Sequence, residues 1–387
     1  MPAVLSHSDL GDLPADRHLS SAPDPYSVYR RLREIGPVVQ MPEVVRSAWA
    51  SGTGESGKVF VVTRYDETEA ALANWAVFSS GPRDPATLVV DPPEHTALRR
   101  HLRDGFTPAA VRVLRADVEA RARGLLYERA AGDELDLAAD YAWDLAGWAI
   151  CTVVGLPMAD RPELTRLYRG GEHRGDPDLK ARLKDYLHGF AAERARHPRD
   201  DLPSRLTAEL GSSLVAGMYT DLFGGGIDNP TSAVGNALLA LAEHPAQRRV
   251  LQAVAHDLPA LTAAVNECIR YDSPIQRIFR FPRRNVALGG KLIPAGSDVL
   301  LLLGSANRDE RRFEDPDQLD LARPPVHNLS FGHGIHFCLG APLTRIVMMA
   351  ALPPLLERFP DYELTGPPER PRRHVERAVL SLPARLG

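Results

Sequence analysis

The chain has few cysteines: only Cys151, Cys268 and Cys338 occur in 387 residues. Their spacing matches neither a zinc site nor a disulfide framework, which excludes a small secreted scaffold held together by disulfides. We therefore expect a reducing compartment, with Cys151 and Cys268 buried in the core as small apolar side chains.

The sequence also lacks a strong charge of either sign, with a formal net charge of −4 and a pI of about 6.4. Neither nucleic acid nor an anionic membrane is favoured as a partner, since both attract strongly basic proteins. Residues 1–19 contain no apolar run long enough for a signal peptide or a membrane anchor. We expect a cytoplasmic protein that is not bound to a membrane.

Cys338 lies in the most informative stretch, residues 331–340, with the sequence FGHGIHFCLG. Its glycines permit turns with positive φ and the close approach of a flat partner. The residues that follow, up to 359, have the pattern of an amphipathic helix. The thiol is therefore expected at a helix N-terminus, where free N–H groups and the helix dipole stabilise the thiolate that binds iron, while apolar neighbours keep water away.

The pattern F-x-x-G-x-x-x-C-x-G in this stretch resembles the haem-binding loop of the cytochrome P450 family. Further motifs in the order and spacing of the family extend the resemblance from about residue 20 to the C-terminus. It implies a mainly α fold with a small β lobe, a single triangular domain over residues 1–387 with a long central helix over the haem, and a flexible segment up to about residue 20. It also implies haem b as cofactor, with Cys338 as the iron ligand and Phe331 beside the haem.

Helices and strands can be assigned along the chain from apolar periodicity and turn residues. Strands are expected over residues 38–42, 58–67 and 276–300, the last with a turn at Gly289 and Gly290, and a flexible loop is expected over 51–57. Helices are expected over residues 24–36, 66–75, 109–131, 137–155 and 179–197. A further helix is expected over residues 261–276, with the sequence LTAAVNECIRYDSPIQ. Loops are expected over residues 132–136, 156–163 and 170–178.

A helix is also expected to begin at residues 91–93, because proline is tolerated in a first helical turn. His95 and Arg99 then lie four residues apart on one face. Such a pair is typical of an ordinary solvated face, but the resemblance implies that both donate to a haem propionate, a buried carboxylate that needs cationic or N–H partners. It gives Arg280 as a second propionate-binding residue and His336 as a third donor.

One long helix is expected from about residue 206 to 244. Its segment LFGGGIDNP resembles the family motif A/G-G-x-D/E-T, which implies Gly225 over the haem and Asp228 as the acid that manages protons during oxygen cleavage. Asn229 stands where the family has threonine, so its role in proton delivery is altered. Pro230 removes a helical N–H and costs about 3 kcal/mol unless a kink relieves it.

Glu267 and Arg270 share a helical face and can pair, which is common on exposed helices. The resemblance adds Arg323 and implies a structural Glu-Arg-Arg cluster behind the haem.

The linker of residues 79–90 is shorter than the family leads us to expect, which predicts an open substrate pocket. The expected pocket walls are mixed apolar residues without an ionic anchor, namely Val89, Val90, Gly225, Ile227, Ile275 and Ile278.

The resemblance implies a haem-thiolate monooxygenase that oxidises a small molecule or a peptide, either free or bound to a carrier, in secondary-metabolite biosynthesis. No flavin or NAD fingerprint occurs in the chain, so electrons must come from a ferredoxin and a ferredoxin reductase. Arg100 and Arg103 form either the basic surface that docks an acidic ferredoxin or a plain solvated face. Two alternatives stay open: oxidative coupling of aromatic rings without oxygen insertion, and a non-catalytic haem sensor or carrier.

Overall fold

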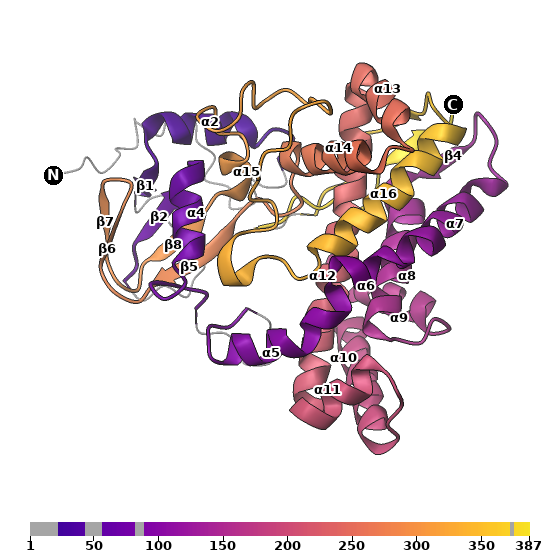
Figure 1. Ribbon diagram of the computed structural model, residues 1–387, viewed down its shortest axis with the longest axis horizontal. Helices are drawn as coiled ribbons and strands as arrows, with labels where there is room; N and C mark the ends of the chain where they lie inside the picture. Colours follow the sequence, from indigo (N-terminus) through magenta and orange to yellow (C-terminus); the bar gives the residue numbers. More distant parts are fainter. Residues whose placement is uncertain (1–21, 43–55, 82–88, 372–374) are drawn as a thin grey trace.

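The computed structural model describes residues 22–42, 56–81, 89–371 and 375–387. The expectations for the first 20 residues, for most of the loop over 51–57 and for the middle of the linker over 79–90 therefore lie outside the described residues. Helices fill one side of a roughly triangular molecule, and a smaller sheet region fills the other (Figure 1). The expectation of a mainly α fold with a small β lobe is confirmed.

The main sheet has the strand order β1-β2-β8-β5-β3, in which β2 and β8 are parallel and the other pairs are antiparallel. Side chains alternate across it, as a period of two requires. Val59 and Val61 of β2 pack towards α2, whereas Phe60 and Val62 pack towards α4. The strands are β1 Val38–Gln40, β2 Val59–Val62, β3 Phe78–Ser79, β5 Ile278–Pro282 and β8 Asp298–Leu301, and a separate hairpin joins β6 Val286–Leu288 to β7 Lys291–Ile293.

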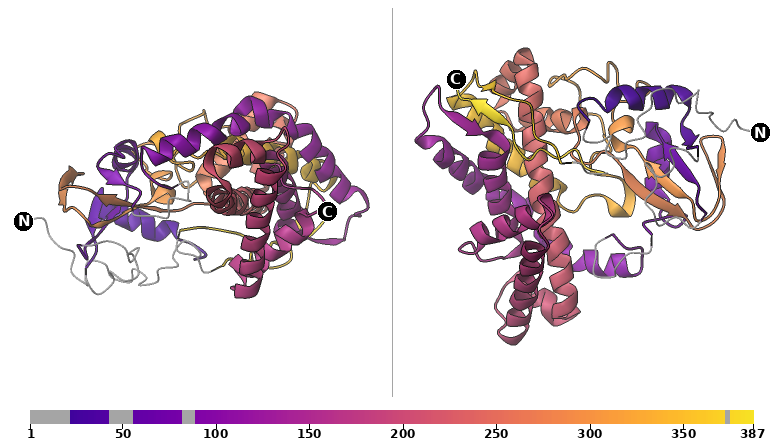
Figure 2. Two further views of the ribbon diagram at one scale, coloured as in Figure 1. Left: turned by 90° about the horizontal axis from the view of Figure 1, so that it is seen from below. Right: turned by 180° about the vertical axis from the view of Figure 1, so that it is seen from behind.

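The helical side is built around α12, a helix of 32 residues that crosses the molecule with α7, α8 and α9 on one side and the sheet region on the other (Figure 2). It packs against α8, α10, α14 and α16, and the shared interface is the largest hydrophobic core. The helices in chain order are α2 Tyr26–Ile35, α4 Tyr65–Ala73, α5 Glu94–Arg103, α6 Pro108–Arg112, α7 Leu114–Tyr127, α8 Trp143–Val154, α9 Arg161–Tyr168, α10 Pro177–Arg196, α11 Leu202–Leu210, α12 Ser212–Glu243, α13 Pro245–Val254, α14 Leu258–Tyr271, α15 Leu303–Ala306 and α16 Ala341–Arg358.

Several boundaries differ from the sequence-based expectations. The helix expected over 206–244 is two helices, because Gly211 between α11 and α12 has a φ of +81° and ends the first of them. The loop expected over 132–136 contains β4 Glu134–Asp136, which pairs with β10 Pro383–Arg385, itself paired with β9 Glu363–Leu364. A pairing across some 250 residues leaves no local signal.

Two further differences concern helices. Helix α9 lies partly in a region that we expected to be a loop, and the π-helical segment Arg169–His173 follows it directly. Helix α16 is buried on almost all sides and is therefore a core helix without the expected amphipathic pattern. Cys151 in α8 and Cys268 in α14 are buried, as expected.

The expected cluster of Glu267, Arg270 and Arg323 is present. The Arg270 Nε atom lies 2.7 Å from one carboxylate oxygen of Glu267, and the Arg323 Nε atom lies 3.2 Å from the other. Arg270 also donates to the backbone carbonyls of Asn307 and Pro316, both at 2.8 Å. Because its charges and hydrogen bonds are paired within the protein, the cluster ties α14 to the segment that precedes the Cys338 loop.

No helix in the described part of the chain is long and apolar enough to cross a membrane.

Candidate functional site

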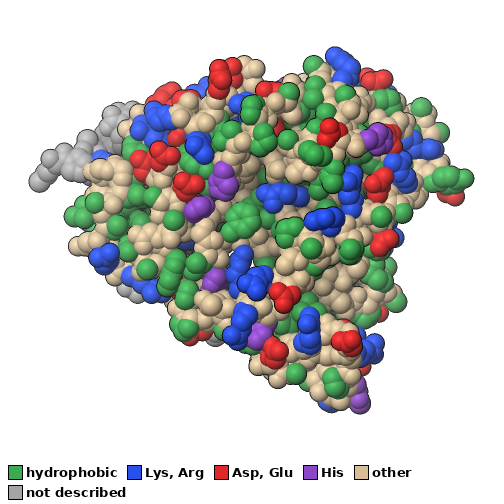
Figure 3. Space-filling view, viewed as in Figure 1, with side chains coloured by type: hydrophobic (Ala, Val, Ile, Leu, Met, Phe, Trp, Pro, Cys, Tyr) green, Lys and Arg blue, Asp and Glu red, His purple; other side chains and the backbone are tan. Residues whose placement is uncertain are grey.

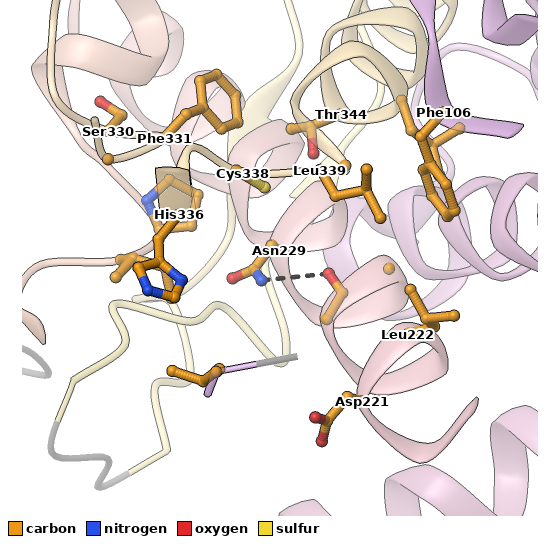
Figure 4. Close-up of a pocket in the computed structure, with 18 of the residues that line it drawn as sticks. Phe106, Asp221, Leu222, Asn229, Ser330, Phe331, His336, Cys338, Leu339 and Thr344 are labelled. Atoms are coloured by element: carbon orange, nitrogen blue, oxygen red, sulfur yellow. Dashed lines mark hydrogen bonds between the residues drawn. The ribbon is translucent and has the colours of Figure 1, made fainter. Parts of the chain in front are cut away.

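A cavity of about 340 Å³ lies between α12 and the loop of residues 331–340 (Figure 4). Cys338 faces it from the loop, and Asn229 faces it from α12. Residues of α5, α8, α14, β5, α15 and the start of α16 also line it. The predicted site residues that line the cavity are His95, Arg99, Gly225, Asn229, Arg280, Phe331, His336 and Cys338.

The backbone of the loop fixes the position of Cys338. Gly332 and Gly334 have φ values of +73° and +70°, and the Cys338 N–H donates to the carbonyl of Phe331 at 2.8 Å. Residues with a side chain rarely adopt these angles, so both glycines are needed for the turn. Cys338 comes two residues before Gly340, the N-cap of α16, which matches the expected position at a helix N-terminus.

Opposing effects act on the pKa of the Cys338 thiol, whereas the sequence suggested only effects that favour the thiolate. Burial raises the pKa of the thiol, and this effect is larger than the opposing contributions of the Gly340 and Ala341 N–H groups and of the Arg99 guanidinium. The helix N-terminus therefore favours the thiolate, as expected, but does not outweigh burial. A metal cation bound at the sulfur would supply the missing stabilisation, because a coordinating thiol is deprotonated.

Four nitrogen-bearing side chains gather at one end of the cavity. His95 and Arg99 come from the same face of α5, Arg280 comes from β5, and His336 comes from the Cys338 loop. The rings of His95 and His336 meet edge to face with 4.4 Å between their centroids. Arg99 donates to the carbonyl of Phe337, so it also braces the loop.

Nitrogen-bearing side chains outnumber carboxylates at this end of the cavity, where Asp91 lies 3.7 Å from the Nε2 atom of His336. His95 is buried, and neither of its ring nitrogens has a hydrogen-bond partner among the described residues. Burial and the neighbouring charges of Arg280 and His95 together lower the pKa of His336 to about 4, against the opposing effect of the Asp91 carboxylate. Buried polar groups are normally paired, so this end fits an anionic ligand. Together with the thiol, it fits an iron porphyrin with two carboxylate side chains.

The three successive glycines of α12 have different packing roles. A Cβ at Gly224 would lie 2.8 Å from the Tyr168 hydroxyl, and a Cβ at Gly226 would lie 2.4 Å from Ile150. Both glycines therefore let α12 pack closely on its neighbours. A Cβ at Gly225 would meet only the Asn229 amide nitrogen, at 3.8 Å, because Gly225 faces the cavity.

Asn229 occupies the place where a threonine is expected. Its Nδ2 atom donates to the carbonyl oxygen of Gly225 at 3.2 Å, one turn earlier in α12 (Figure 4). Pro230, which also lines the cavity, has no N–H for the carbonyl of Gly226. The Gly225 carbonyl thus gains a side-chain donor, and the Gly226 carbonyl lacks its usual backbone donor. The hydrogen bonding of α12 therefore differs from that of a regular helix at two adjacent residues of the cavity wall.

Asp228 does not line the cavity in the described structure, contrary to the expectation that it is the ionisable group beside the haem. It is buried and points to the far side of α12, where its carboxylate accepts hydrogen bonds from Tyr168 and His173, both at 2.8 Å. These partners lie at the end of α9 and in the π-helical segment Arg169–His173. Sequence analysis missed both, because that region was assigned largely to a loop.

The apolar walls are mostly as expected, since Val89, Gly225, Ile275 and Ile278 line the cavity. Val90 and Ile227 do not: both are buried in the large hydrophobic core. Ile227 follows Gly225 by two residues and so points to another side of α12.

The expectation that the pocket has no ionic anchor was wrong. Asp221 is the one carboxylate among the described residues that line the cavity, and it precedes Gly225 and Asn229 at a spacing of four (Figure 4). That spacing places the three residues on one helical face. The periodicity of the helix therefore carried a signal that sequence analysis did not use.

Comparison with known proteins gives relatives over almost the whole chain. The family model described as "Cytochrome P450" matches residues 180–385. The cytochrome P450 monooxygenase PikC of Streptomyces venezuelae is 34% identical over 394 aligned residues, which cover 95% of this chain and 90% of PikC.

Solved structures are similar in fold as well. HmtN, described as a post-tailoring hydroxylase involved in himastatin biosynthesis, superposes with a TM-score of 0.79 at 30% identity and covers 86% of this chain and 92% of its own. P450BioI, solved in complex with an acyl carrier protein that carries hexadec-9Z-enoic acid, gives a TM-score of 0.82 at 27% identity and covers 94% and 98%.

Proposed function

Because this chain belongs to the cytochrome P450 family, we propose that it is a haem-thiolate monooxygenase that oxidises a small molecule or a peptide in secondary-metabolite biosynthesis. The observation that carries the proposal is the position of Cys338, which faces a cavity that His95, Arg99, Arg280 and His336 also line. The relatives named as a monooxygenase and a hydroxylase support oxygen insertion over the two alternatives of aromatic coupling and haem sensing.

The proposal is tested by turnover under isotopically labelled O₂. Protein loaded with haem and supplied with a surrogate ferredoxin, its reductase and NADH should transfer one labelled oxygen atom to the product. A coupled product without label would support the alternative of aromatic coupling, and no product from any bound substrate would support the haem sensor.

The cofactor in this proposal is haem b. Cys338 would hold the iron, His95, Arg99, Arg280 and His336 would bind the two propionates, and Phe331 and Gly225 would contact the ring system. Bound to a thiolate, haem iron supplies the activation of O₂, and the chain supplies binding, orientation and protons.

Protons are the part of the reaction that depends most on this chain's own residues. Gly225 leaves space at the cavity wall, and Asn229 holds the Gly225 carbonyl through its amide N–H. An amide has separate donor and acceptor ends and relays protons poorly. Asp228, the neighbouring residue, is therefore the proposed source of protons, reached through a change in its contacts with Tyr168 and His173.

Electrons in this proposal come from a ferredoxin and its reductase. Lys and Arg side chains gather over the middle of the face seen in Figures 1 and 3, near α5 and α16. Arg100 and Arg103 of α5 are exposed and suit an acidic partner. The free thiols of the three cysteines support a location in the cytoplasm, and we propose that the chain functions as one domain.

Loss of a propionate partner should weaken the retention of haem. Arg99→Ala, Arg280→Ala and His95→Ala are each expected to reduce haem affinity by about 1.5–3 kcal/mol, the size of a charge-assisted hydrogen bond. Haem transfer to apomyoglobin, followed by absorbance, measures the effect. Arg103→Ala on the exposed side of α5 is the matched control, and equal haem retention in all four variants would show that the propionates bind elsewhere.

The substrate is expected to be large. The linker of residues 79–90 has about a dozen residues, fewer than the family leads us to expect, which favours an open pocket, whereas pockets for small ligands usually bury most of the ligand surface. An acyl carrier protein bound to P450BioI supports a carrier-bound substrate here as well. A screen for shifts of the haem absorption band should therefore find peptides or carrier-tethered amino acids, and tight shifts from terpenoid-sized molecules alone would contradict this expectation.

A further inference from the structure

Glu69, His327 and His333 lie close together outside the cavity. The Oε1 atom of Glu69 is 3.9 Å from the Nδ1 atom of His327 and 4.0 Å from the Nδ1 atom of His333. All three of these atoms lie within 4.8 Å of one another. The two imidazole rings meet edge to face with 5.7 Å between centroids. Three groups that can each offer a lone pair therefore converge on one point.

The three side chains come from three different segments. Glu69 lies in α4, His327 lies in the segment that leads to the Cys338 loop, and His333 lies in that loop. Helix α4 and the loop are in close backbone contact, since a Cβ at Gly334 would lie 2.9 Å from the carbonyl oxygen of Leu72. The convergence is thus fixed by the packing of the backbone, while the side chains remain 37–47% exposed.

We propose that Glu69, His327 and His333 form a surface site for one divalent metal ion of the Zn²⁺ class, bound through two imidazole nitrogens and one carboxylate oxygen. Tetrahedral zinc sites hold their ligand atoms at about 2.0–2.2 Å from the ion, which places the ligands roughly 3.3 Å apart. Small changes of exposed side-chain angles can close the present distances to that value. Open positions remain for water, because all three ligands are at the surface.

The two imidazole nitrogens among the proposed ligands favour some divalent ions over others. Imidazole nitrogen suits Zn²⁺, Ni²⁺, Co²⁺ and Cu²⁺, whereas Mg²⁺ and Ca²⁺ prefer oxygen ligands alone. This proposal does not depend on the chemistry in the cavity, since none of the three ligands lines it.

The Tyr65 hydroxyl contacts two of the three proposed ligands, Glu69 and His327. Its hydroxyl lies 2.9 Å from Nδ1 of His327, 3.0 Å from the His327 carbonyl oxygen and 3.4 Å from Oε1 of Glu69. When an ion takes the Nδ1 lone pair, the hydroxyl can still donate to the carbonyl or to Glu69 and so orient the ligands. The guanidinium of Arg312 lies 4.9 Å from the Tyr65 ring and weakens cation binding by repulsion.

A bound ion would join α4 to the loop that carries Cys338. An ion that binds the folded chain and not the unfolded chain stabilises the fold. We therefore expect Zn²⁺ to raise the unfolding temperature of the haem-loaded protein and to slow the release of haem.

Equilibrium dialysis of the haem-loaded protein against Zn²⁺, with metal analysis, tests the proposal. We expect one ion per chain, and at least about tenfold weaker binding in each of Glu69→Gln, His327→Ala and His333→Ala, the scale of loss seen even for outer-shell changes. His256→Ala is the matched control, since this histidine is 85% exposed and remote in sequence from the site; it should bind Zn²⁺ unchanged, and Mg²⁺ should not compete.

Variants that bind Zn²⁺ as tightly as the unchanged protein, or a control that loses the ion equally, would overturn the site. All four altered side chains are partly or fully exposed, so the variants should fold, which their haem absorption and unfolding temperature without metal verify.

Discussion

Replacing Cys338 by alanine is expected to abolish the red-shifted absorption band that reduced cytochrome P450 proteins show with carbon monoxide. The band requires a sulfur ligand on the iron, and alanine offers no electron pair. His336 is the nearest other ligand type in the loop, but its Nε2 atom already lies 3.1 Å from the Ser80 hydroxyl. The measurement is a difference spectrum of reduced protein with and without carbon monoxide.

The chain provides two matched controls for this experiment. Cys151→Ala and Cys268→Ala remove thiols that are buried in α8 and α14 and do not line the cavity. Both variants should keep the band in proportion to their haem content. A band that survives in Cys338→Ala would refute the assignment of the iron ligand and, with it, the proposed function.

Replacing Asp228 by asparagine is expected to lower turnover by about 10²-fold or more, the usual scale for a positioned acid–base group. The amide can still bond to Tyr168 or His173 but cannot carry a proton at this position. Asn229→Ala should cost much less, and Asn229→Thr should scarcely improve the coupling of electrons to product. The measurement is product formed per NADH consumed for the three variants with one substrate.

The position of Asp228 makes a structural role the main competing explanation. Its hydrogen bonds tie α12 to the connection between α9 and α10. His173→Phe removes one of these ties, because phenylalanine has no hydrogen-bond donor, and leaves the carboxylate in place. If Asp228→Asn and His173→Phe lower the unfolding temperature equally and both keep full turnover, then Asp228 is a tether. An inert Asp228→Asn with a dead Asn229→Ala would instead reverse the two roles.

The sequence predicted the parts of the site that rest on local rules. The position of Cys338 follows from glycines that permit positive φ and from the helix after them, and the shared face of His95 and Arg99 follows from a spacing of four. The main sheet was also predictable in part, because residues 59–62 form a short apolar run, which is typical of a strand that is buried on both faces. These features need no knowledge of distant segments.

Features that depend on distant segments were not predictable. The direction of the Asp228 side chain is set by Tyr168 and His173, which precede it by 60 and 55 residues and lie in elements that sequence analysis missed. Strand β4 depends likewise on its pairing with β10 near the end of the chain. Ile227 was wrongly expected in the pocket. Which side of α12 faces the cavity depends on how the helix is rotated about its axis, and tertiary packing sets that rotation.

The parallel pairing of β2 with β8 has a consequence for synthesis on the ribosome. Val59 of β2 pairs with Asp298, so the strand stays without this neighbour until more than three quarters of the chain has been made. Contacts between residues far apart in sequence slow folding and expose unpaired strand edges in the meantime. The N-terminal strands, although translated first, thus complete their sheet late, and we expect chains halted before residue 298 to aggregate or to recruit chaperones.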